Sequence, residues 1–437
     1  MDIDIHGIDK TFIDIKKRIA NSEISANNKT ALNDFAEDCL LGWKIRRVSK
    51  TRTSTLLTRL LVLTRELKKE WMQFDERDSK KLLLWMDEKY PLPDHDWTQH
   101  SYRIVLRKFV TWVRHRYGYP DAYPDKERLM IALSAGKYAL EVSHIHLKEP
   151  NRLRDAQLIP TDAEMECLRN IACNPRDKAY IEMSIENGER VGALATRQIK
   201  HIAFDDLGAK VVLHDKTFRG EPVRYITSAV YLRHWLEVHP FKNDPEAPVW
   251  IDLTKLPAQA ALSYDGVRRL IYRLIVKHNK QARDNGQPLI RKTLTTHLFR
   301  YYAQTRDMKR GMPRSIQTKQ RGWSPTSRQP EKYARLTTDD VDDYFRQQYG
   351  IKANIEKPTK DEIVQCPRCR ELNNPKDLRC YRCGMSMRID VTLKMEKDNE
   401  EINSAMAVLL EDPEFKKLLW KRKQKIEAEL LRRQTKK

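Results

Sequence analysis

The stretch His297-Leu298-Phe299-Arg300 places an imidazole and a guanidinium three residues apart, on one face of the helix that the apolar pattern predicts for residues 295–309. By itself the pair is weak evidence for a functional site. Its weight comes from a longer series of polar and aromatic residues: Arg190, Lys216, His297, Arg300, Trp323 and Tyr333. Phosphoryl transfer needs cations fixed on the nonbridging oxygens, an in-line nucleophile and a proton donor for the leaving oxygen. The series contains residue types suited to each task.

The charge of the chain indicates a polyanionic partner. Lys and Arg together number 82 and Asp and Glu 61, which gives a net charge of +21 over 437 residues. An excess of this size is self-repulsive unless a polyanion neutralises it, whereas a modest excess would only serve solubility. Because basic residues occur in every segment of the chain, we expect nucleic acid as the partner.

The sequence shows no sign of export or of a membrane segment. It has no run of about 18 apolar residues, and residues 1–6 lack the basic and apolar regions of a signal peptide. We therefore expect an intracellular, cytoplasmic protein that does not act at a membrane.

Length and hydrophobic periodicity predict at least two domains. The chain has 437 residues, and one hydrophobic core stops growing at roughly 250–300 residues. Residues 8–145 have helical periodicity, which predicts an all-α domain over 1–150. Its apolar stripes include Leu56, Leu57, Leu60, Leu61 and Leu63, and also Val105, Leu106, Phe109, Val110 and Trp112. The basic residues expected opposite the second stripe, on a face turned to solvent or to phosphate, are Arg103, Arg107, Lys108, Arg114 and Arg116.

A second domain is predicted over residues 156–350. The aperiodic, proline-containing stretch 146–160 is interpreted as a linker, and Thr161 with Glu164 forms a capping box that starts the next helix. Short β-like runs follow at 211–213 and 223–226. Further helical patterns follow at 267–283, 295–309 and 339–348. The expected fold class is therefore mainly α with a small antiparallel β-sheet.

Four cysteines near the C-terminus predict a metal site. Cys366-Pro-Arg-Cys369 and Cys380-Tyr-Arg-Cys383 are two CxxC pairs, and the two-residue gap lets both thiolates of a pair reach one tetrahedral ion. Free or redox thiols are the alternative. Because four protein ligands leave no open position, the ion would be a structural Zn²⁺. The predicted order is a linker over 351–365, a zinc ribbon over 366–387 and a basic helical segment over 388–437.

Local motifs surround the residues of the series. They are Asn187-Gly188-Glu189-Arg190-Val191-Gly192, Gly322-Trp323-Ser324-Pro325, Glu331-Lys332-Tyr333-Ala334 and Asp340-Val341-Asp342-Asp343. Their order and spacing resemble the tyrosine recombinase (phage integrase) family, and the second and fourth motifs look like its archaeal branch. The resemblance covers about residues 160–350, and more loosely the helical domain before them. It implies a helical, SAM-like core-binding domain that binds DNA, followed by a recombinase catalytic domain.

The resemblance also implies a role for each residue of the series. Arg190 and Arg300 would grip the scissile phosphate with their planar guanidinium forks, and Tyr333 would be the nucleophile. Lys216 would be the general acid for the departing 5′ hydroxyl, with Lys210 as the alternative lysine. His297 would assist proton transfer or bind the phosphate, and Trp323 would brace the site through its indole N–H. The resulting 3′-phosphotyrosyl link requires no metal, nucleotide or other small molecule.

Two positions depart from the family pattern, and several tyrosines compete for the role of nucleophile. Ala193 stands where an acidic residue often follows the first arginine, and Tyr301 stands where a histidine often follows the second. The distance of ten residues from Trp323 favours Tyr333 as the nucleophile. Its competitors are Tyr301, Tyr302, Tyr344 and Tyr349.

The expected function is site-specific DNA recombination or integration by breaking and rejoining double-stranded DNA. The resemblance implies a homotetramer on paired sites and a DNA-associated location in the cytoplasm. Two alternatives use the same fold. One is a DNA-binding regulator without catalysis, and the other is a type IB topoisomerase-like enzyme that relaxes supercoils without exchanging strands.

Overall fold

The computed structural model describes most of the first 350 residues and short parts of the chain beyond them. The described residues are 3–43, 45–121, 123, 125–147, 158–205, 207–214, 219–291, 294–350, 364–366, 371–373, 377, 379–380, 382–384 and parts of 404–420. The chain divides into two compact units, Met1–Arg154 and Asp155–Lys437. The predicted 146–160 linker lies mostly outside the described residues.

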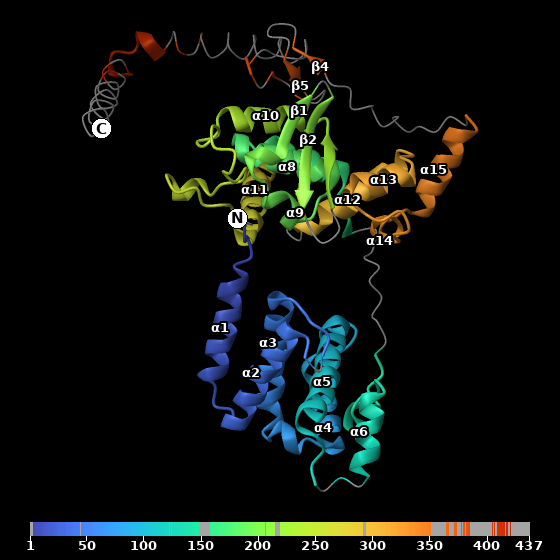
Figure 1. Cartoon of the computed structure of the whole chain (residues 1–437). Helices are drawn as coiled ribbons and strands as arrows, with labels where there is room; N and C mark the ends of the chain where they lie inside the picture. The colour runs from blue at the N-terminus through green and yellow to red at the C-terminus, as the bar shows by residue number, and fades with distance from the viewer. Residues whose placement is uncertain are drawn as a thin grey trace. The chain divides into compact units, whose positions relative to one another are not determined.

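The first unit is built from helices (Figure 1). They are α1 (Ile8–Ala20), α2 (Ala26–Leu41), α3 (Lys50–Leu67), α4 (Glu76–Lys89), α5 (Asp96–Tyr117) and α6 (Lys126–Ser134), with the short 3₁₀ helices η1 (Trp71–Gln73) and η2 (Leu140–Val142). The predicted apolar stripes of α3 and α5 are buried in one core. The ring of Phe35 from α2 packs edge-on against Phe109 of α5, with ring centroids 5.0 Å apart.

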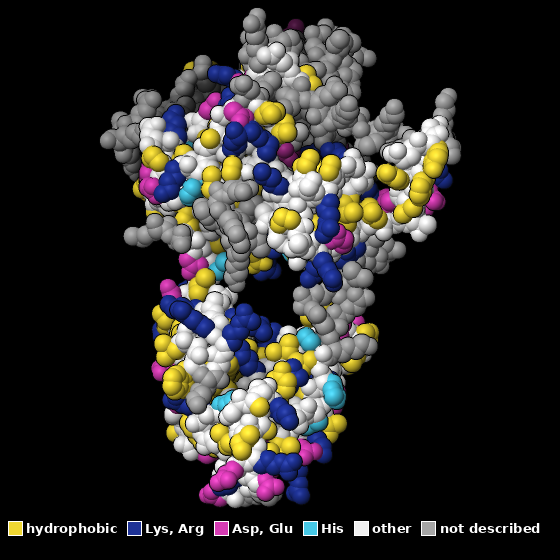
Figure 2. Space-filling model, turned by 45° about the vertical axis from the view of Figure 1, so that its right-hand side comes forward, with side chains coloured by type: hydrophobic (Ala, Val, Ile, Leu, Met, Phe, Trp, Pro, Cys, Tyr) yellow, Lys and Arg dark blue, Asp and Glu magenta, His cyan; other side chains and the backbone are white. Residues whose placement is uncertain are grey.

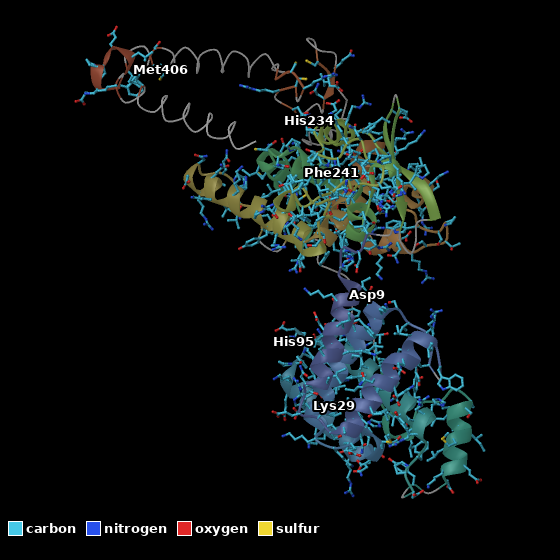
Figure 3. The ribbon with its side chains drawn as sticks, turned by 60° about the vertical axis from the view of Figure 1, so that its left-hand side comes forward. Asp9, Lys29, His95, His234, Phe241 and Met406 are labelled. Carbon is cyan, nitrogen blue, oxygen red and sulfur yellow. The ribbon has the colours of Figure 1, made fainter. Side chains whose placement is uncertain are left out.

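Exposed polar pairs join the first helices of this unit. Lys50 at the start of α3 donates to Asp9 of α1 at 2.6 Å, and Lys29 of α2 donates to the carbonyl of Ala20 at the end of α1 at 2.9 Å. Figure 3 labels Asp9 and Lys29. Exposed ion pairs contribute about 0–1 kcal/mol each. The buried apolar side chains therefore account for most of the stability of the unit.

Arg114 lies in the core and not on the basic face predicted for α5. The residue is 1% exposed. Its Nε donates to Glu141 at 2.7 Å, its Nη1 to the carbonyl of Met72 at 2.9 Å and its Nη2 to the carbonyl of Phe74 at 2.6 Å. Buried carbonyls need donors, and Arg114 supplies donors to two that lie in and just after η1. The prediction of a solvated or phosphate-facing side chain was wrong for this residue.

The second unit combines helices with a small sheet (Figure 1). Strands β1 (Ile202–Asp205), β2 (Gly208–His214) and β3 (Arg219–Tyr225) form an antiparallel sheet in the order β1-β2-β3, in which Val211 pairs with both Ile202 and Val223. The helices are α7 (Asp162–Ile171), α8 (Pro175–Asn187), α9 (Val191–Ala195), α10 (Ala229–Glu237), α11 (Tyr264–Asp284), α12 (Thr296–Lys309), α13 (Arg314–Gln320), α14 (Gln329–Tyr333) and α15 (Thr338–Gln348). The expected fold class, mainly α with a small antiparallel sheet, is confirmed.

The capping box predicted at the start of α7 is present. Thr161 accepts from the backbone N–H of Glu164 at 3.2 Å, and Glu164 accepts from the backbone N–H of Thr161 at 2.9 Å. Arg291 also donates to Glu164, with Nη2 at 2.7 Å from Oε2. Burial alone would raise the pKa of Glu164, but the hydrogen bonds from Arg291 and Thr161 outweigh it and lower the pKa to about 2. The same carboxylate thus caps α7 and ties it to the chain just before α12.

The described residues beyond 350 are few. β4 (Val364–Gln365) and β5 (Leu372–Asn373) form a short antiparallel pair beside the cysteines. Asp412 accepts from the backbone N–H groups of Glu414 and Phe415, as a helix N-cap does. Most of the predicted linker over 351–365 and of the helical segment over 388–437 lies outside the described residues. No described helix combines the length and the apolar composition that crossing a bilayer requires.

Candidate active site

Arg300 lies at the centre of the candidate site, on the buried side of α12. The residue is 1% exposed, whereas His297 one turn earlier is exposed. Nη1 of Arg300 donates to the carbonyl of Gly188 at 3.3 Å, and it lies 3.8 Å from Oε2 of Glu189, whose side chain is fully buried. One nitrogen of the guanidinium is therefore anchored to the segment that follows α8.

Gly188 allows that segment to lie against α12. The residue ends α8 with a φ of +61°, in the left-handed region, where a Cβ is unfavourable. A Cβ at this position would lie 2.6 Å from the carbonyl oxygen of Phe299 and 2.7 Å from Cα of Arg300. Both are backbone atoms, so no rotamer change could make room. Arg190 follows as the N-cap of α9.

The charges around Arg300 change its pKa. Burial lowers the pKa, the carboxylate of Glu189 raises it, and the positive charge of Arg190 lowers it again, to a value of about 10. The guanidinium is still charged at pH 7. The electrostatic effect of Arg190 means that the two predicted phosphate-binding arginines lie near each other.

Two aromatic rings, those of Trp323 and of the predicted nucleophile Tyr333, lie beside the Arg300 guanidinium. The Cζ atom of Arg300 lies 4.8 Å from the ring centroid of Trp323 and 5.2 Å from that of Tyr333. The rings of Trp323 and Tyr333 are parallel within 6°, with centroids 5.8 Å apart. The His297 ring lies 5.4 Å from the Tyr333 ring. Tyr333 is 7% exposed and Trp323 is 6% exposed. The structure thus brings together four of the predicted site residues: His297, Arg300, Trp323 and Tyr333. Arg190 lies close enough for its charge to lower the pKa of Arg300.

Several N–H donors in this cluster are buried without a partner. Among the described residues, Nε and Nη2 of Arg300 and Nε1 of Trp323 have no hydrogen-bond acceptor. A buried donor left unsatisfied costs roughly 1–3 kcal/mol. Arg114 in the first unit, by contrast, uses all three of its guanidinium nitrogens. A ligand with several acceptor oxygens would satisfy the donors of Arg300 and Trp323.

The predicted general acid, Lys216, lies outside the described residues, between β2 and β3 in the sequence. The alternative lysine, Lys210 on β2, is described. It pairs with Asp205 at 3.0 Å, and about half of its side chain is exposed. This ion pair gives Lys210 a structural partner at the sheet.

The competing tyrosines have other surroundings. Tyr302 is buried and donates to Asp162 at 2.6 Å. Burial and the nearby charge of Asp162 raise the pKa of Tyr302 well above its usual value. Tyr344 and Tyr349 are exposed at 54% and 76%. Tyr301 packs against the Tyr333 ring at 5.0 Å. These surroundings favour Tyr333, whose ring contacts both the Arg300 guanidinium and the Trp323 ring.

Sequence reasoning missed two charged residues of this cluster, Glu189 and Arg321. Glu189 lies within the first quoted motif, directly before Arg190, and Arg321 directly precedes the motif that begins at Gly322. Both are buried, at 5% and 0% exposure. Arg321 donates through Nη2 to Asp307 of α12, and its Cζ lies 5.9 Å from the ring centroid of Trp323. A charged residue within or directly beside such a motif was the signal that could have identified them.

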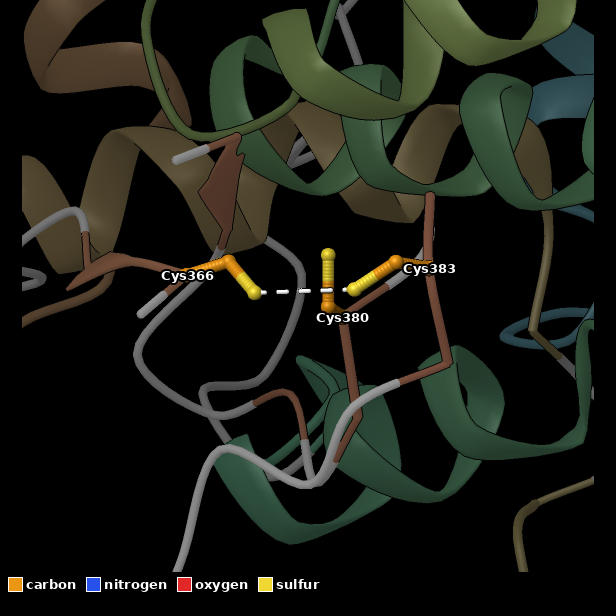
Figure 4. Close-up of side chains that lie close together, drawn as sticks. All are labelled: Cys366, Cys380 and Cys383. Atoms are coloured by element: carbon orange, nitrogen blue, oxygen red, sulfur yellow. Dashed lines mark hydrogen bonds between the residues drawn. The ribbon is translucent and has the colours of Figure 1, made fainter. Parts of the chain in front are cut away.

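Three of the four predicted metal ligands are described, and they lie together (Figure 4). The Sγ atoms of Cys366, Cys380 and Cys383 all lie within 4.8 Å of one another, and those of Cys366 and Cys383 are 3.7 Å apart. A tetrahedral zinc site with Zn–S bonds of about 2.3 Å separates its sulfurs by about 3.8 Å. The cluster therefore fits such an ion. Cys369 lies outside the described residues.

Comparison with known proteins supports the fold through structure alone. No family model matches the chain, and no curated protein matches it. The Tn1549 transposon integrase, solved with transposon right end DNA, has a TM-score of 0.50 and 15% identity, over 73% of this chain and 99% of that one. A lambda integrase dimer bound to a core site has a TM-score of 0.48 and 12% identity, over 70% and 94% of the two chains.

The XerA recombinase has a TM-score of 0.37 and 13% identity, over 74% of this chain and 98% of that one. Of these three likenesses, the one to the Tn1549 integrase has the highest TM-score. The helices that frame Arg300, the three-stranded sheet and this likeness together give the chain the fold of the tyrosine recombinases.

Proposed function

We propose that the protein is a site-specific DNA recombinase, or integrase, that cleaves and rejoins double-stranded DNA through a 3′-phosphotyrosyl intermediate. The observation that carries the proposal is the position of the Tyr333 ring, 5.2 Å from the guanidinium carbon of a buried Arg300. Two nitrogens of that guanidinium have no acceptor among the described residues. The proposed nucleophile and the proposed anion-binding group therefore lie next to each other.

In the proposed reaction Arg190 and Arg300 hold the nonbridging oxygens of the scissile phosphate. The Tyr333 hydroxyl attacks phosphorus, and the 5′ oxygen leaves with a proton, which we assign to Lys216. A free tyrosine has a pKa of about 10, so about one in a thousand is ionised at pH 7. The attack therefore needs a base that takes the phenol proton, a role that we assign to His297. His297 assists proton transfer, and Trp323 supports the phosphate site through its indole N–H.

The proposal predicts that the substitution Tyr333→Phe abolishes the covalent protein–DNA adduct and leaves DNA binding unchanged. The ring and its contacts are retained, and only the attacking oxygen is lost. The measurement uses a DNA duplex nicked next to the cleavage point, which traps the adduct for gel analysis. Tyr301→Phe is the matched control, because Tyr301 packs against Tyr333 but is assigned no chemistry. It should retain the adduct.

Other results would change the assignment of the nucleophile or of the function. An adduct formed by Tyr333→Phe would place the nucleophile at another tyrosine. A wild-type chain that binds DNA and forms no adduct on its own target would be a regulator without catalysis. Relaxation of supercoiled DNA without joining of two sites would indicate the topoisomerase alternative.

Double-stranded DNA is the proposed partner, and the protein would be DNA-associated in the cytoplasm. Lys and Arg side chains occur on both units on the face drawn in Figure 2, and the net charge of the chain is +21. Lambda integrase has been solved as a tetramer bound to a Holliday junction. By analogy we propose a homotetramer on paired recombination sites for this chain.

We further propose that Cys366, Cys369, Cys380 and Cys383 hold one structural Zn²⁺. The bound ion would fix the fold of the ribbon, and catalysis would not pass through it. Elemental analysis of the purified chain should find one zinc per chain, and Cys366→Ser should lose most of it because one thiolate ligand is removed. The control Cys173→Ser should keep its zinc, since Cys173 is an exposed cysteine distant in sequence from the cluster. Wild-type protein without zinc would contradict the assignment.

A further inference from the structure

Arg321 is a fully buried arginine beside the candidate active site. It is 0% exposed and follows α13 directly, two residues before Trp323. Its Nη2 donates to Asp307 on α12, the helix that also carries Arg300. The guanidinium carbons of Arg321 and Arg300 lie 5.9 and 4.8 Å from the ring centroid of the same residue, Trp323. Arg321 therefore belongs to the same cluster as the proposed phosphate-binding arginine.

The hydrogen bonds of Arg321 differ from those of two other arginines, Arg306 and Arg114, whose donors all bind protein groups. Arg306 on α12 donates from Nε to Asp307 at 3.0 Å, from Nη1 to the carbonyl of Ile185 at 2.9 Å and from Nη2 to the carbonyl of Glu186 at 2.5 Å. Arg114 likewise uses all three nitrogens. In Arg321, Nε and Nη1 are buried and have no acceptor among the described residues. Arg300 shows the same pattern at Nε and Nη2.

The net charge of the cluster also favours the binding of an anion. Burial lowers the pKa of Arg300, and the positive charges of Arg190 and Arg321 lower it further. Two carboxylates lie among these three arginines, because Glu189 pairs with Arg300 and Asp307 with Arg321. Asp307 is shared with Arg306. The cluster thus has more positive than negative charge in a buried place, where repulsion is poorly screened. A bound phosphate would provide the missing negative charge and acceptor oxygens.

We propose that Arg321 is a third cation of the phosphate site, acting on the scissile phosphate together with Arg190 and Arg300. This inference rests on the proposed function. Arg321 is as deeply buried as Arg300, since Arg300 is 1% exposed and Arg321 is 0% exposed. A purely structural arginine would have no reason to keep two buried donors unsatisfied beside another arginine.

The test compares two DNA substrates that differ at the scissile position. One carries the natural phosphodiester, and the other carries a methylphosphonate, in which a methyl group replaces one nonbridging oxygen and removes the negative charge. The full-length chain is used, and the rate of covalent adduct formation is measured on both. On the phosphodiester, Arg321→Met should react about 100-fold more slowly than the wild type, which is typical for loss of one donor to a charged transition state. On the methylphosphonate the defect should shrink to less than about 10-fold, because there is no longer a charge to balance.

Arg306→Met is the matched control. It removes a mostly buried arginine, whose side chain is 15% exposed, from the same carboxylate, Asp307. Because all its donors bind protein groups, any defect should be equal on the two substrates. The ratio of the two rates also allows for partial misfolding, since an unfolded fraction lowers both rates by the same factor. Should Arg321→Met not fold at all, Arg321→Gln also removes the charge but keeps a donor for Asp307, and its defect should likewise be smaller on the methylphosphonate.

The outcomes separate this inference from the proposed function. If the wild-type chain forms no adduct on its phosphodiester target, the proposed function fails. If the wild type forms the adduct and Arg321→Met has the wild-type ratio of rates, Arg321 is structural and the inference is overturned. The inference is supported if Arg321→Met loses less of its rate on the methylphosphonate than on the phosphodiester, and Arg306→Met loses the same share on both.

Discussion

Replacing Gly188 by alanine should destabilise the second unit by roughly 3–5 kcal/mol and reduce adduct formation by more than about 100-fold. The residue has a φ of +61°, and the new Cβ would lie 2.6 Å from the carbonyl oxygen of Phe299 and 2.7 Å from Cα of Arg300. Relief of these contacts requires α8 and α12 to move apart. That movement would change the position of Arg300 relative to Arg190, on which the proposed chemistry depends.

Gly311→Ala is the control for the backbone conformation alone. Gly311 has a φ of +71°, and a Cβ there would meet nothing within 4 Å. This substitution should cost about 1–2 kcal/mol and leave the rate of adduct formation unchanged. Hydrogen exchange of α8 and α12, measured by mass spectrometry, reports the stability of the unit. Equal effects of the two substitutions would show that the close approach at Gly188 is unimportant.

In the first unit, Arg114→Met should lower the free energy of unfolding by about 3–5 kcal/mol. The substitution leaves Glu141, which is 1% exposed, as a buried carboxylate without its guanidinium. It also removes the donors to the carbonyls of Met72 and Phe74. Loss of one member of a buried ion pair is costly because the remaining charge has neither solvent nor partner. Hydrogen exchange of α5, compared with peptides of the second unit, would locate the loss.

Arg116→Met provides the comparison on the same helix. The Arg116 side chain is 37% exposed, and its nearest carboxylates, Asp34 and Asp38, lie 3.9 and 3.8 Å away. A pair of this kind contributes about 0–1 kcal/mol. Protection of α5 that falls equally in Arg114→Met and Arg116→Met would contradict the structural role of Arg114.

The fold could be predicted from the sequence where periodicity alone decides it. The leucine stripe of α3 and the capping box of Thr161 and Glu164 depend on local spacing, and both are present. The α12 helix begins within one residue of the predicted start. Local spacing could not reveal that Arg114 is buried, because the carbonyls it satisfies belong to a 3₁₀ segment about 40 residues earlier in the chain. Only the folded chain shows where those carbonyls need donors.

Local spacing also predicted part of the candidate site. His297 and Arg300 share a helix, so their spacing defines a common face of it. The family resemblance was needed to add Trp323 and Tyr333, which lie against Arg300 in space. Glu189 and Arg321 were missed because a charged residue in a turn is normally solvated. Their burial follows from the close packing of the segments after α8 and α13 on α12.

The ring stack of Tyr333 on Trp323 bears on which subunit of the proposed tetramer would supply the tyrosine for each cut. The stack is formed within one polypeptide, and the same polypeptide supplies the guanidinium beside it. Under the proposed function, each subunit would therefore cut with its own tyrosine, in cis. The proposed cut would then need no catalytic side chain from a neighbouring subunit.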